Sequence, residues 1–288
     1  MKELSRMEQL CFNTVRIETT NARGQAGSGT GFIVVLDVDG KMAPLVVTNK
    51  HVIAGNAIGR IVLTVADSEG NPNYEDHFPA VFNGGLGENW IEHPDPNIDL
   101  CVMPLNPLVD MVKNRYGKNL FIKAFSSEHI MTKSRTSDID VGEDILMIGY
   151  PNGLWDSVNN MPIIRKGILA TNVSLDYNGR REFVIDAACF PGSSGSPVFI
   201  CNSGGRIDKK GNVEFGGNRL ILLGVLYAGP QYTVAGRMRV VNIPTAQQVV
   251  QPISSIPNNL GYVIKADALF DFIPIIKEIL RTGKINNE

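Results

Sequence analysis

Beyond its first dozen residues, the chain consists of short apolar runs separated by glycine, asparagine, aspartate and proline. These runs are rich in valine, isoleucine, leucine and phenylalanine, which is typical of β-strands bounded by turns. Many short strands with turn residues between them indicate an all-β sandwich or barrel. The predicted strands are 12–17, 31–36, 43–48, 59–65, 100–105, 145–149, 183–187, 197–200, 220–227 and 260–265.

Two segments show helical spacing of their apolar residues instead. The first ten residues predict a short helix at the N-terminus, and residues 267–281 predict a longer helix near the C-terminus. Asp267 is suited to cap the start of the longer helix. Pro274 lies inside it, so we expect this residue to kink the helix or to delay its start.

The remaining stretches carry little pattern. Residues 107–140 are interpreted as a connector between two sub-domains, and residues 229–259 as a long surface loop. Few residues follow 281, so we expect no appended PDZ module.

Composition narrows the class of protein. At 288 residues and 43% hydrophobic content, the chain can bury a large core and is too apolar to be disordered. Its 27 basic and 29 acidic residues give a net charge of −2, so no overall field attracts nucleic acid or an anionic membrane. No apolar run approaches the ~20 residues of a membrane helix. Charged residues interrupt the N-terminal segment, so it does not match a secretory signal peptide. We therefore expect a cytoplasmic protein.

The sequence contains no recognisable metal-binding or cofactor-binding motif. The four cysteines contain no C-x-x-C pair, so no zinc site is predicted, and in a reducing compartment they should be free thiols. The glycine-rich segment 27–31 does not satisfy the dinucleotide-binding spacing. We predict that the protein has neither a metal site nor a cofactor.

Candidate chemistry begins with Ser194, in a loop of small residues that leads directly into an apolar strand. A serine that attacks a carbonyl group needs an exposed hydroxyl on a rigid turn. It also needs backbone N–H groups directed at the developing oxyanion, and Gly192 and Gly195 permit that geometry. Taken alone, the same residues fit a flexible turn, so the assignment depends on finding a base.

His51 is the best candidate for this base, because it directly follows an apolar strand. The other histidines, His77, His93 and His129, lie in polar, loop-like contexts, and His93 is the only rival. Asp99 opens another apolar strand, where an unpaired carboxylate is costly to bury. We therefore expect Asp99 to have a partner, and a histidine base requires an orienting carboxylate.

In the order His51, Asp99, Ser194, these segments resemble the trypsin/chymotrypsin clan of serine peptidases. VVTNKHVI resembles the strand-then-histidine signature, especially that of bacterial trypsin-like and Deg-type peptidases. NIDLCVMPL resembles the aspartate-led strand, and PGSSGSPVF resembles the Gly-x-Ser-Gly-x-Pro loop of the nucleophile. By the order of its motifs, the resemblance covers roughly residues 12 to 281.

The resemblance implies two six-stranded antiparallel β-barrels, chymotrypsin-like, with a short N-terminal helix and a C-terminal helix. Residues 1–135 would hold the first barrel with His51 and Asp99, and residues 136–288 the second barrel with Ser194. Together they would form one peptidase unit.

The resemblance also implies the roles of the residues. His51 would act as general base, Asp99 would orient it, and Ser194 would be the nucleophile of a serine endopeptidase. The oxyanion hole would come from the backbone of Gly192, Ser193 and Ser194.

Substrate binding is predicted on the same basis. Ala188 carries no charge at the base of the pocket for the residue before the scissile bond, so we expect small or medium apolar residues there. The strand before residue 229 would pair with the substrate backbone. The predicted substrate-binding residues are Ala188, Cys189, Val225, Leu226, Tyr227 and Ala228.

The expected partner is a protein or peptide substrate, with neither nucleic acid nor a membrane, and a regulatory partner would be compatible with these residues. Two alternatives stay open from the sequence. One is a catalytically silent module that binds peptides or partners, and the other is an acyl hydrolase that prefers esters.

Overall fold

The computed structural model describes most of the chain and establishes the arrangement of its strands and helices. The described residues are 3–83, 88–202, 204–207, 209, 211–216, 218–229, 231–235, 253–257 and 259–282.

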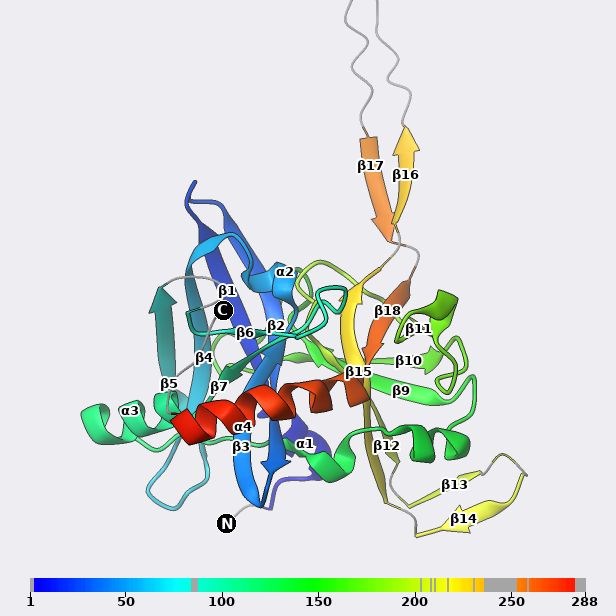
Figure 1. Ribbon diagram of the computed structural model, residues 1–288, viewed down its shortest axis with the longest axis horizontal. Helices are drawn as coiled ribbons and strands as arrows, with labels where there is room; N and C mark the ends of the chain where they lie inside the picture. Colours follow the sequence, from blue (N-terminus) through cyan, green and yellow to red (C-terminus); the bar gives the residue numbers. More distant parts are fainter. Residues whose placement is uncertain are drawn as a thin grey trace, which may run out of the picture.

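The N-terminal half contributes eight strands to one sheet. They are β1 (Thr14–Asn21), β2 (Ala26–Val38), β3 (Lys41–Thr48), β4 (Asn56–Ala66), β5 (Pro72–Asn83), β6 (Ile91–Glu92), β7 (Cys101–Pro104) and β8 (Phe125–Ser126). The strand order is β5-β4-β1-β2-β3-β7-β6, and β8 pairs with β2 beside this path (Figure 1). All pairs in the path are antiparallel, whereas β8 runs parallel to β2.

The C-terminal half closes into a barrel of six strands, in the order β10-β11-β18-β15-β12-β9. Two hairpins, β13–β14 and β16–β17, extend from it (Figure 1). The strands of this half are β9 (Asp144–Gly149), β10 (Ile163–Leu169), β11 (Glu182–Asp186), β12 (Pro197–Asn202), β13 (Gly205–Ile207), β14 (Val213–Phe215), β15 (Arg219–Ala228), β16 (Gln231–Ala235), β17 (Ile253–Pro257) and β18 (Leu260–Lys265).

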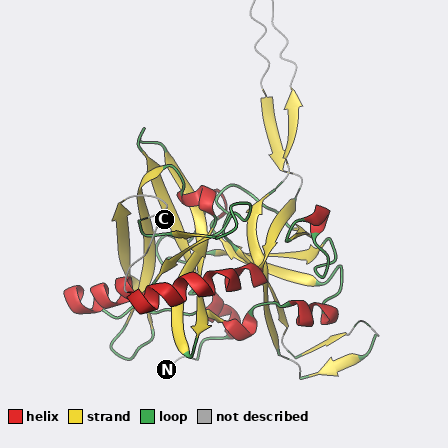
Figure 2. Ribbon diagram, in the orientation of Figure 1, coloured by secondary structure: helices red, strands yellow, loops and turns green. Residues whose placement is uncertain are grey.

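The prediction of an all-β fold with a helix at each end is confirmed, and strands dominate the ribbon in Figure 2. The two halves differ in closure. Among the described residues, the six C-terminal strands form a closed barrel, whereas the eight N-terminal strands form a sheet that does not close. In the first sheet the end strands β5 and β6 share no pairing among the described residues, and β6 is only two residues long. Residues 84–87, which connect these two strands, lie outside the described part.

Helices occupy the ends of the chain and a few connections. The α-helices are α1 (Arg6–Cys11), α2 (Lys50–Ile53), α3 (Asn106–Tyr116) and α4 (Ile273–Thr282). The 3₁₀ helices are η1 (Ser127–His129), η2 (Lys133–Asp138), η3 (Pro151–Gly153), η4 (Tyr177–Gly179) and η5 (Ala266–Phe272).

The C-terminal helix begins later as an α-helix than its apolar stripe suggests. Residues 266–272 form η5, and α4 starts one residue before Pro274. Proline is tolerated in the first turn of a helix, because the N–H that it lacks would have no partner there. The prediction that Asp267 caps the helix is wrong. Its carboxylate instead accepts a hydrogen bond of 2.9 Å from Arg181 Nε of the neighbouring barrel.

α3 was not predicted, because residues 107–140 were interpreted as a connector. Its only buried residue is Val112, so it has little of the apolar stripe that reveals a helix. Pro107 lies in its first turn, and Gly117 ends it in the left-handed conformation with a φ of 65°. Likewise, the ends of the predicted loop 229–259 form the β16–β17 ladder, and the rest of that loop lies outside the described residues.

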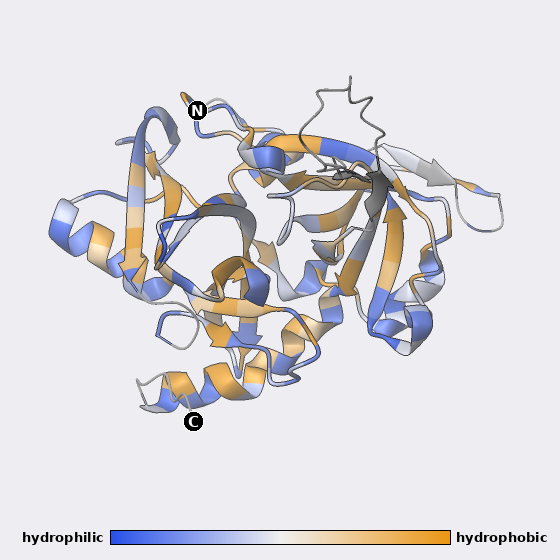
Figure 3. Cartoon of the chain, turned by 90° about the horizontal axis from the view of Figure 1, so that it is seen from above, coloured by the Kyte–Doolittle hydropathy of each residue, from blue (hydrophilic) through white to orange (hydrophobic). Residues whose placement is uncertain are grey.

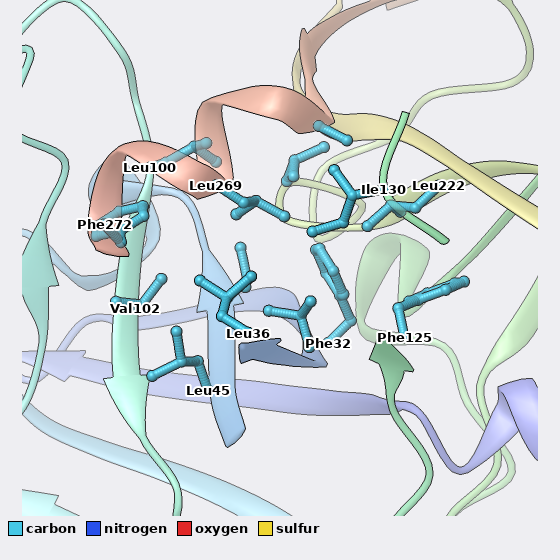
Figure 4. Close-up of a cluster of buried hydrophobic side chains, with 14 of the residues drawn as sticks. Phe32, Leu36, Leu45, Leu100, Val102, Phe125, Ile130, Leu222, Leu269 and Phe272 are labelled. Carbon is cyan, nitrogen blue, oxygen red and sulfur yellow. The ribbon is translucent and has the colours of Figure 1, made fainter. Parts of the chain in front are cut away.

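A continuous apolar core joins the two halves. Figure 4 shows Phe32 from β2 between Phe125 from β8 and Leu36, with Leu222 from β15 nearby and Phe272 of η5 at the other end of the cluster. Each large apolar side chain that is fully buried contributes about 1.5–3 kcal/mol to folding. Figure 3 shows the same segregation, with hydrophobic residues along the strands and alternating hydrophobic and hydrophilic bands on α4. The sheet and the barrel are therefore held in a fixed relation.

Candidate active site

His51 is the second residue of the short helix α2, which directly follows β3. The buried residue Asn49 precedes this helix, and its side-chain amide donates a hydrogen bond of 2.8 Å to the Asp99 carbonyl oxygen. The end of β3 is thereby tied to the loop that carries Asp99. The His51 side chain is 49% exposed, so one face of its ring is open to a substrate.

Asp99 binds His51 through both carboxylate oxygens. Oδ1 accepts a hydrogen bond of 3.1 Å from the His51 backbone N–H, and Oδ2 lies 2.5 Å from the ring nitrogen Nδ1. A carboxylate at this distance holds the ring proton on Nδ1, which leaves Nε2 as the free acceptor. The two residues that the sequence predicts as base and orienting acid are thus in direct contact.

His93, the rival base, has both ring nitrogens occupied. Nδ1 accepts a hydrogen bond of 3.0 Å from the Asp95 N–H, and Nε2 lies 3.1 Å from the Ala268 carbonyl oxygen. The ring is fully buried and meets the edge of the Phe272 ring, with centroids 5.2 Å apart. It therefore anchors the Asp99 loop to η5 and has no free nitrogen for a substrate.

The loop before Ser194 forms a tight turn at Pro191 and Gly192. The Ser193 N–H donates to the Phe190 carbonyl oxygen at 2.9 Å, and Gly192 has a φ of +86°. Proline at the second position and a positive φ at the third define a type II β-turn. The Pro191 carbonyl oxygen accepts a hydrogen bond of 2.5 Å from the Asn152 N–H, which fixes the orientation of the Pro191–Gly192 peptide.

This turn decides which backbone groups are available as oxyanion donors. Of the three residues predicted for the oxyanion hole, Ser193 uses its N–H to close the turn. Within the described part of the chain, the N–H groups of Gly192 and Ser194 donate to no other group. A side chain at residue 192 would stand 2.5 Å from the Tyr150 carbonyl oxygen, so the turn requires glycine there.

Thr30 of β2 holds this loop, a role that the sequence analysis did not detect. Its N–H donates to the Ser194 carbonyl oxygen at 2.8 Å, and its hydroxyl donates to the Gly192 carbonyl oxygen at 2.9 Å. The same hydroxyl accepts a hydrogen bond of 3.1 Å from the Tyr150 N–H. Thr30 is fully buried, and β2 carries no motif that distinguishes this threonine from others in strands.

The Thr30 carbonyl oxygen completes the link to the base. It accepts a hydrogen bond of 2.7 Å from the hydroxyl of Thr48, three residues before His51. Gly195 packs against the same oxygen, where a Cβ would lie only 1.9 Å away, and its φ is +87°. The nucleophile loop and the His51 helix are therefore fixed to one residue of β2.

Ser194 is half-buried at the tip of this loop. Its hydroxyl donates a long hydrogen bond of 3.4 Å to the Tyr227 carbonyl oxygen. Among the described residues, no hydrogen bond joins this hydroxyl to His51.

Two of the predicted substrate-binding residues serve another purpose. Val225 and Leu226 have fully buried side chains, so these side chains are not open to a substrate. The Leu226 carbonyl oxygen accepts a hydrogen bond of 2.8 Å from the Gly195 N–H, and its own N–H donates to Ser196 at 3.0 Å. Leu226 thus holds the nucleophile loop from the side opposite Thr30.

Tyr227 and Ala228, the next residues of β15, are partly exposed. A register shift lies between Leu226 and Ala228, which turns the Tyr227 carbonyl oxygen toward Ser194. The Tyr227 hydroxyl donates a hydrogen bond of 2.5 Å to Glu182. Burial, followed by the nearby Glu182 carboxylate, raises the pKa of the Tyr227 phenol, so it stays neutral.

Ala188 and Cys189 lie on the segment that leads to the nucleophile loop. Ala188 is partly exposed, whereas Cys189 is buried against Gly261 and Gly229. Burial raises the pKa of the Cys189 thiol to about 11, so this wall carries no thiolate near neutral pH.

The described residues contain no group of three or more histidine, cysteine, aspartate or glutamate side chains arranged to hold a metal ion. A search of the same part of the chain finds no helix long and apolar enough to cross a membrane.

A histidine paired with a carboxylate, and a serine on a turn with two free N–H groups, are the components that a hydrolase with a nucleophilic serine requires. A family model for the trypsin-like peptidase domain matches residues 29–207. This range covers more than half of the chain and includes His51, Asp99 and Ser194. The chain belongs to this family: it is a trypsin-like serine protease whose substrates are peptides or proteins.

Several solved structures are similar to this chain at low sequence identity. A protease from M. tuberculosis in its active form is 15% identical over 96% of this chain and 84% of that chain, with a TM-score of 0.45. A serine endoprotease from Yersinia pestis is 15% identical over 98% and 70%, with a TM-score of 0.46. A thermostable serine protease from an extremophilic microorganism is 13% identical over 92% and 97%, with a TM-score of 0.46.

Replacing Thr30 by valine should impair the active site without enlarging or emptying the core. The change leaves the Gly192 carbonyl oxygen and the Tyr150 N–H buried without partners, at about 1–3 kcal/mol each. We expect kcat to fall roughly 10- to 100-fold, because misplacing a reacting group by about 1 Å costs up to this much. Steady-state kinetics and thermal unfolding of Thr30→Val measure both effects. Thr30→Ser retains the hydroxyl and should stay close to wild type; equal behaviour of the two variants would contradict the role of the hydroxyl.

His93 should make the stability of the protein depend on pH. Burial lowers the pKa of His93 below its ordinary value of 6.5, although the Ala268 carbonyl and Asp271 oppose this shift. Below pH 6.5 the unfolded chain therefore binds a proton that the folded protein excludes, and stability is lost as the pH falls. The stability advantage of wild type over His93→Gln should be larger at pH 7.5 than at pH 5.5. Urea unfolding at both pH values measures it, and an advantage that does not change with pH would refute this role.

Proposed function

We propose that the protein is an endopeptidase that cleaves peptide bonds through an acyl-enzyme on Ser194, with His51 as base and Asp99 as its orienting acid. The observation that carries this proposal is the double contact between Asp99 and His51, at 3.1 Å and 2.5 Å. It fixes the proton on Nδ1 and leaves Nε2 free to accept a proton.

The reaction begins when the Ser194 hydroxyl turns from the Tyr227 carbonyl oxygen to His51. The hydrogen bond that it gives up is long, at 3.4 Å, so the rotation costs little. Catalytic hydrogen bonds are often absent before the substrate binds and form in the complex. His51 Nε2 then takes the hydroxyl proton while Oγ attacks the substrate carbonyl carbon.

The negative charge that develops on the substrate oxygen is stabilised by the N–H groups of Gly192 and Ser194. The hydrogen bond from the Asn152 N–H to the Pro191 carbonyl oxygen keeps the Gly192 N–H directed away from the turn before a substrate arrives. His51 next gives its proton to the leaving amine as the C–N bond breaks. Water then attacks the acyl-enzyme, with His51 again as base, and releases the acid and Ser194.

The substrate backbone is proposed to pair with the end of β15. Beyond Leu226 the chain is partly exposed at Tyr227 and Ala228 and exposed at Gly229, so it can accept one more strand. Ala188 and the neutral, buried Cys189 support a pocket for a small or medium apolar residue just before the scissile bond.

A fluorophosphonate probe combined with casein turnover tests the proposed triad. Wild type should be labelled and should cleave casein, whereas Ser194→Ala should show neither activity. Asp99→Asn should lower kcat by about 10⁴-fold, because the histidine then adopts the wrong tautomer. Asp110→Asn, an exposed carboxylate on α3, is the matched control and should leave both readings unchanged.

Other outcomes separate the alternative functions. A wild-type protein that never labels near neutral pH would be a binding module. One that labels and hydrolyses esters, but not casein or peptides, would be an ester-preferring hydrolase.

A peptide library tests the pocket. We expect cleavage to follow small and medium apolar residues, because neither Ala188 nor the neutral Cys189 offers a charge to a substrate side chain. A profile dominated by lysine, arginine or glutamate at this position would contradict the assignment.

A further inference from the structure

A cavity of about 580 Å³ lies beside the nucleophile loop, at the junction of β1, β2, β4 and the η3 turn. Its polar lining comes from Arg16, Glu18, Arg60 and Ser28, together with the backbone of Asn152 and Gly153.

The backbone around this cavity is bonded directly to the catalytic loop. The Asn152 N–H holds the Pro191 carbonyl oxygen at 2.5 Å, and Thr30, two residues after Ser28, holds Ser194 and Gly192. Asn152 therefore connects the oxyanion turn directly to the cavity.

The opposite side of the nucleophile belongs to the acyl half of the substrate. A second cavity, of about 560 Å³, lies there against Tyr227 and Asp99, and it shares no lining residue with the first. In Figure 1 the strands β1, β2 and β4 lie on one side of α2, which carries His51, and β15 and β18 lie on the other. Since the acyl half pairs with the end of β15, the cavity at Arg16 and Arg60 faces the leaving-group half.

This cavity contains two cations for one carboxylate. Glu18 forms an ion pair with Arg16 Nη1, and its other oxygen lies 3.4 Å from Arg60 Nε. The register of β1 and β4 places Glu18 directly opposite Arg60. The charges leave a net excess of one positive charge, which favours an incoming carboxylate and opposes an incoming cation.

The two arginines differ in their freedom to respond. Arg16 is held, because its guanidinium stacks on the Trp155 ring at 3.6 Å and only 13% of its side chain is exposed. Arg60 is 51% exposed and shares Glu18 through a longer contact, so it can turn to a new acceptor. Ile58 and Val81, both exposed at the same cavity, can cover the aliphatic stem of a glutamate.

We propose that this cavity selects an acidic residue on the leaving-group side of the scissile bond, with Arg60 as the specificity-determining residue. The proposal rests on the proposed endopeptidase function. The acidic side chain binds Arg60 while Arg16 remains paired with Glu18 against Trp155.

Matched peptides test this selectivity. A peptide cleaved by wild type is synthesised with glutamate, glutamine or lysine at the first, second or third position after the scissile bond. At one of these positions we expect kcat/KM to be about two- to fivefold higher for glutamate than for glutamine, as a half-exposed ion pair provides. Lysine should be the poorest of the three, and 0.5 M NaCl should reduce the differences.

Variants at residue 60 identify the responsible side chain. Arg60→Gln should bring the glutamate-to-glutamine ratio close to one. Arg60→Lys keeps the charge and should keep part of the preference, while Arg115→Gln, on α3, should leave the ratio unchanged. Equal rates for glutamate and glutamine at all three positions, or a preference that survives in Arg60→Gln, would overturn the proposal. Failure of wild type to cleave any peptide would instead overturn the endopeptidase function on which it rests.

Discussion

The active site depends on the hydrogen bonds that Thr30 makes across the boundary between the sheet and the barrel. Ser194 belongs to the barrel, whereas His51 and Asp99 belong to the sheet, so chemistry requires that the two halves keep one relative position. Thr30 is fully buried in the sheet and binds the loop at Gly192 and at Ser194. The apolar core runs continuously from β2 to β15 and holds the sheet and the barrel together. Thr30 then fixes the position of the nucleophile loop against the sheet.

Much of the fold could be predicted from the sequence, because the spacing of apolar residues and the presence of turn-forming residues are local properties. Each of the ten predicted apolar runs contributes residues to an observed strand, and the contact of Asp99 with His51 follows from the cost of burying a lone carboxylate. The strands β5 and β10 were missed because most of their residues are exposed or partly exposed, which removes the apolar run. The helix α3 was missed because it buries a single side chain.

The rest of the site could not be predicted, because it is built from backbone groups. The N–H of Asn152, the carbonyl oxygen of Pro191 and both polar groups of Leu226 position the nucleophile loop, and a backbone group is the same for almost every residue type. Val225 and Leu226 are predicted as substrate-binding residues because their strand resembles the one that pairs with the substrate backbone in the family. Both residues lie in β15, which ends beside Ser194. However, the Leu226 backbone binds the nucleophile loop, and both side chains are buried.

This reliance on the main chain also shapes how such a protein can evolve. The N–H of Asn152 supports the oxyanion turn, and Asn152 is exposed and lines the same cavity as Arg16. Asn152 has a left-handed backbone with a φ of 51°, which asparagine and glycine adopt more readily than other residues, so few substitutions there would leave the turn intact. Natural selection can therefore change the proposed selectivity at Arg60, whose side chain takes no part in the turn, more freely than at Asn152, whose backbone the turn requires.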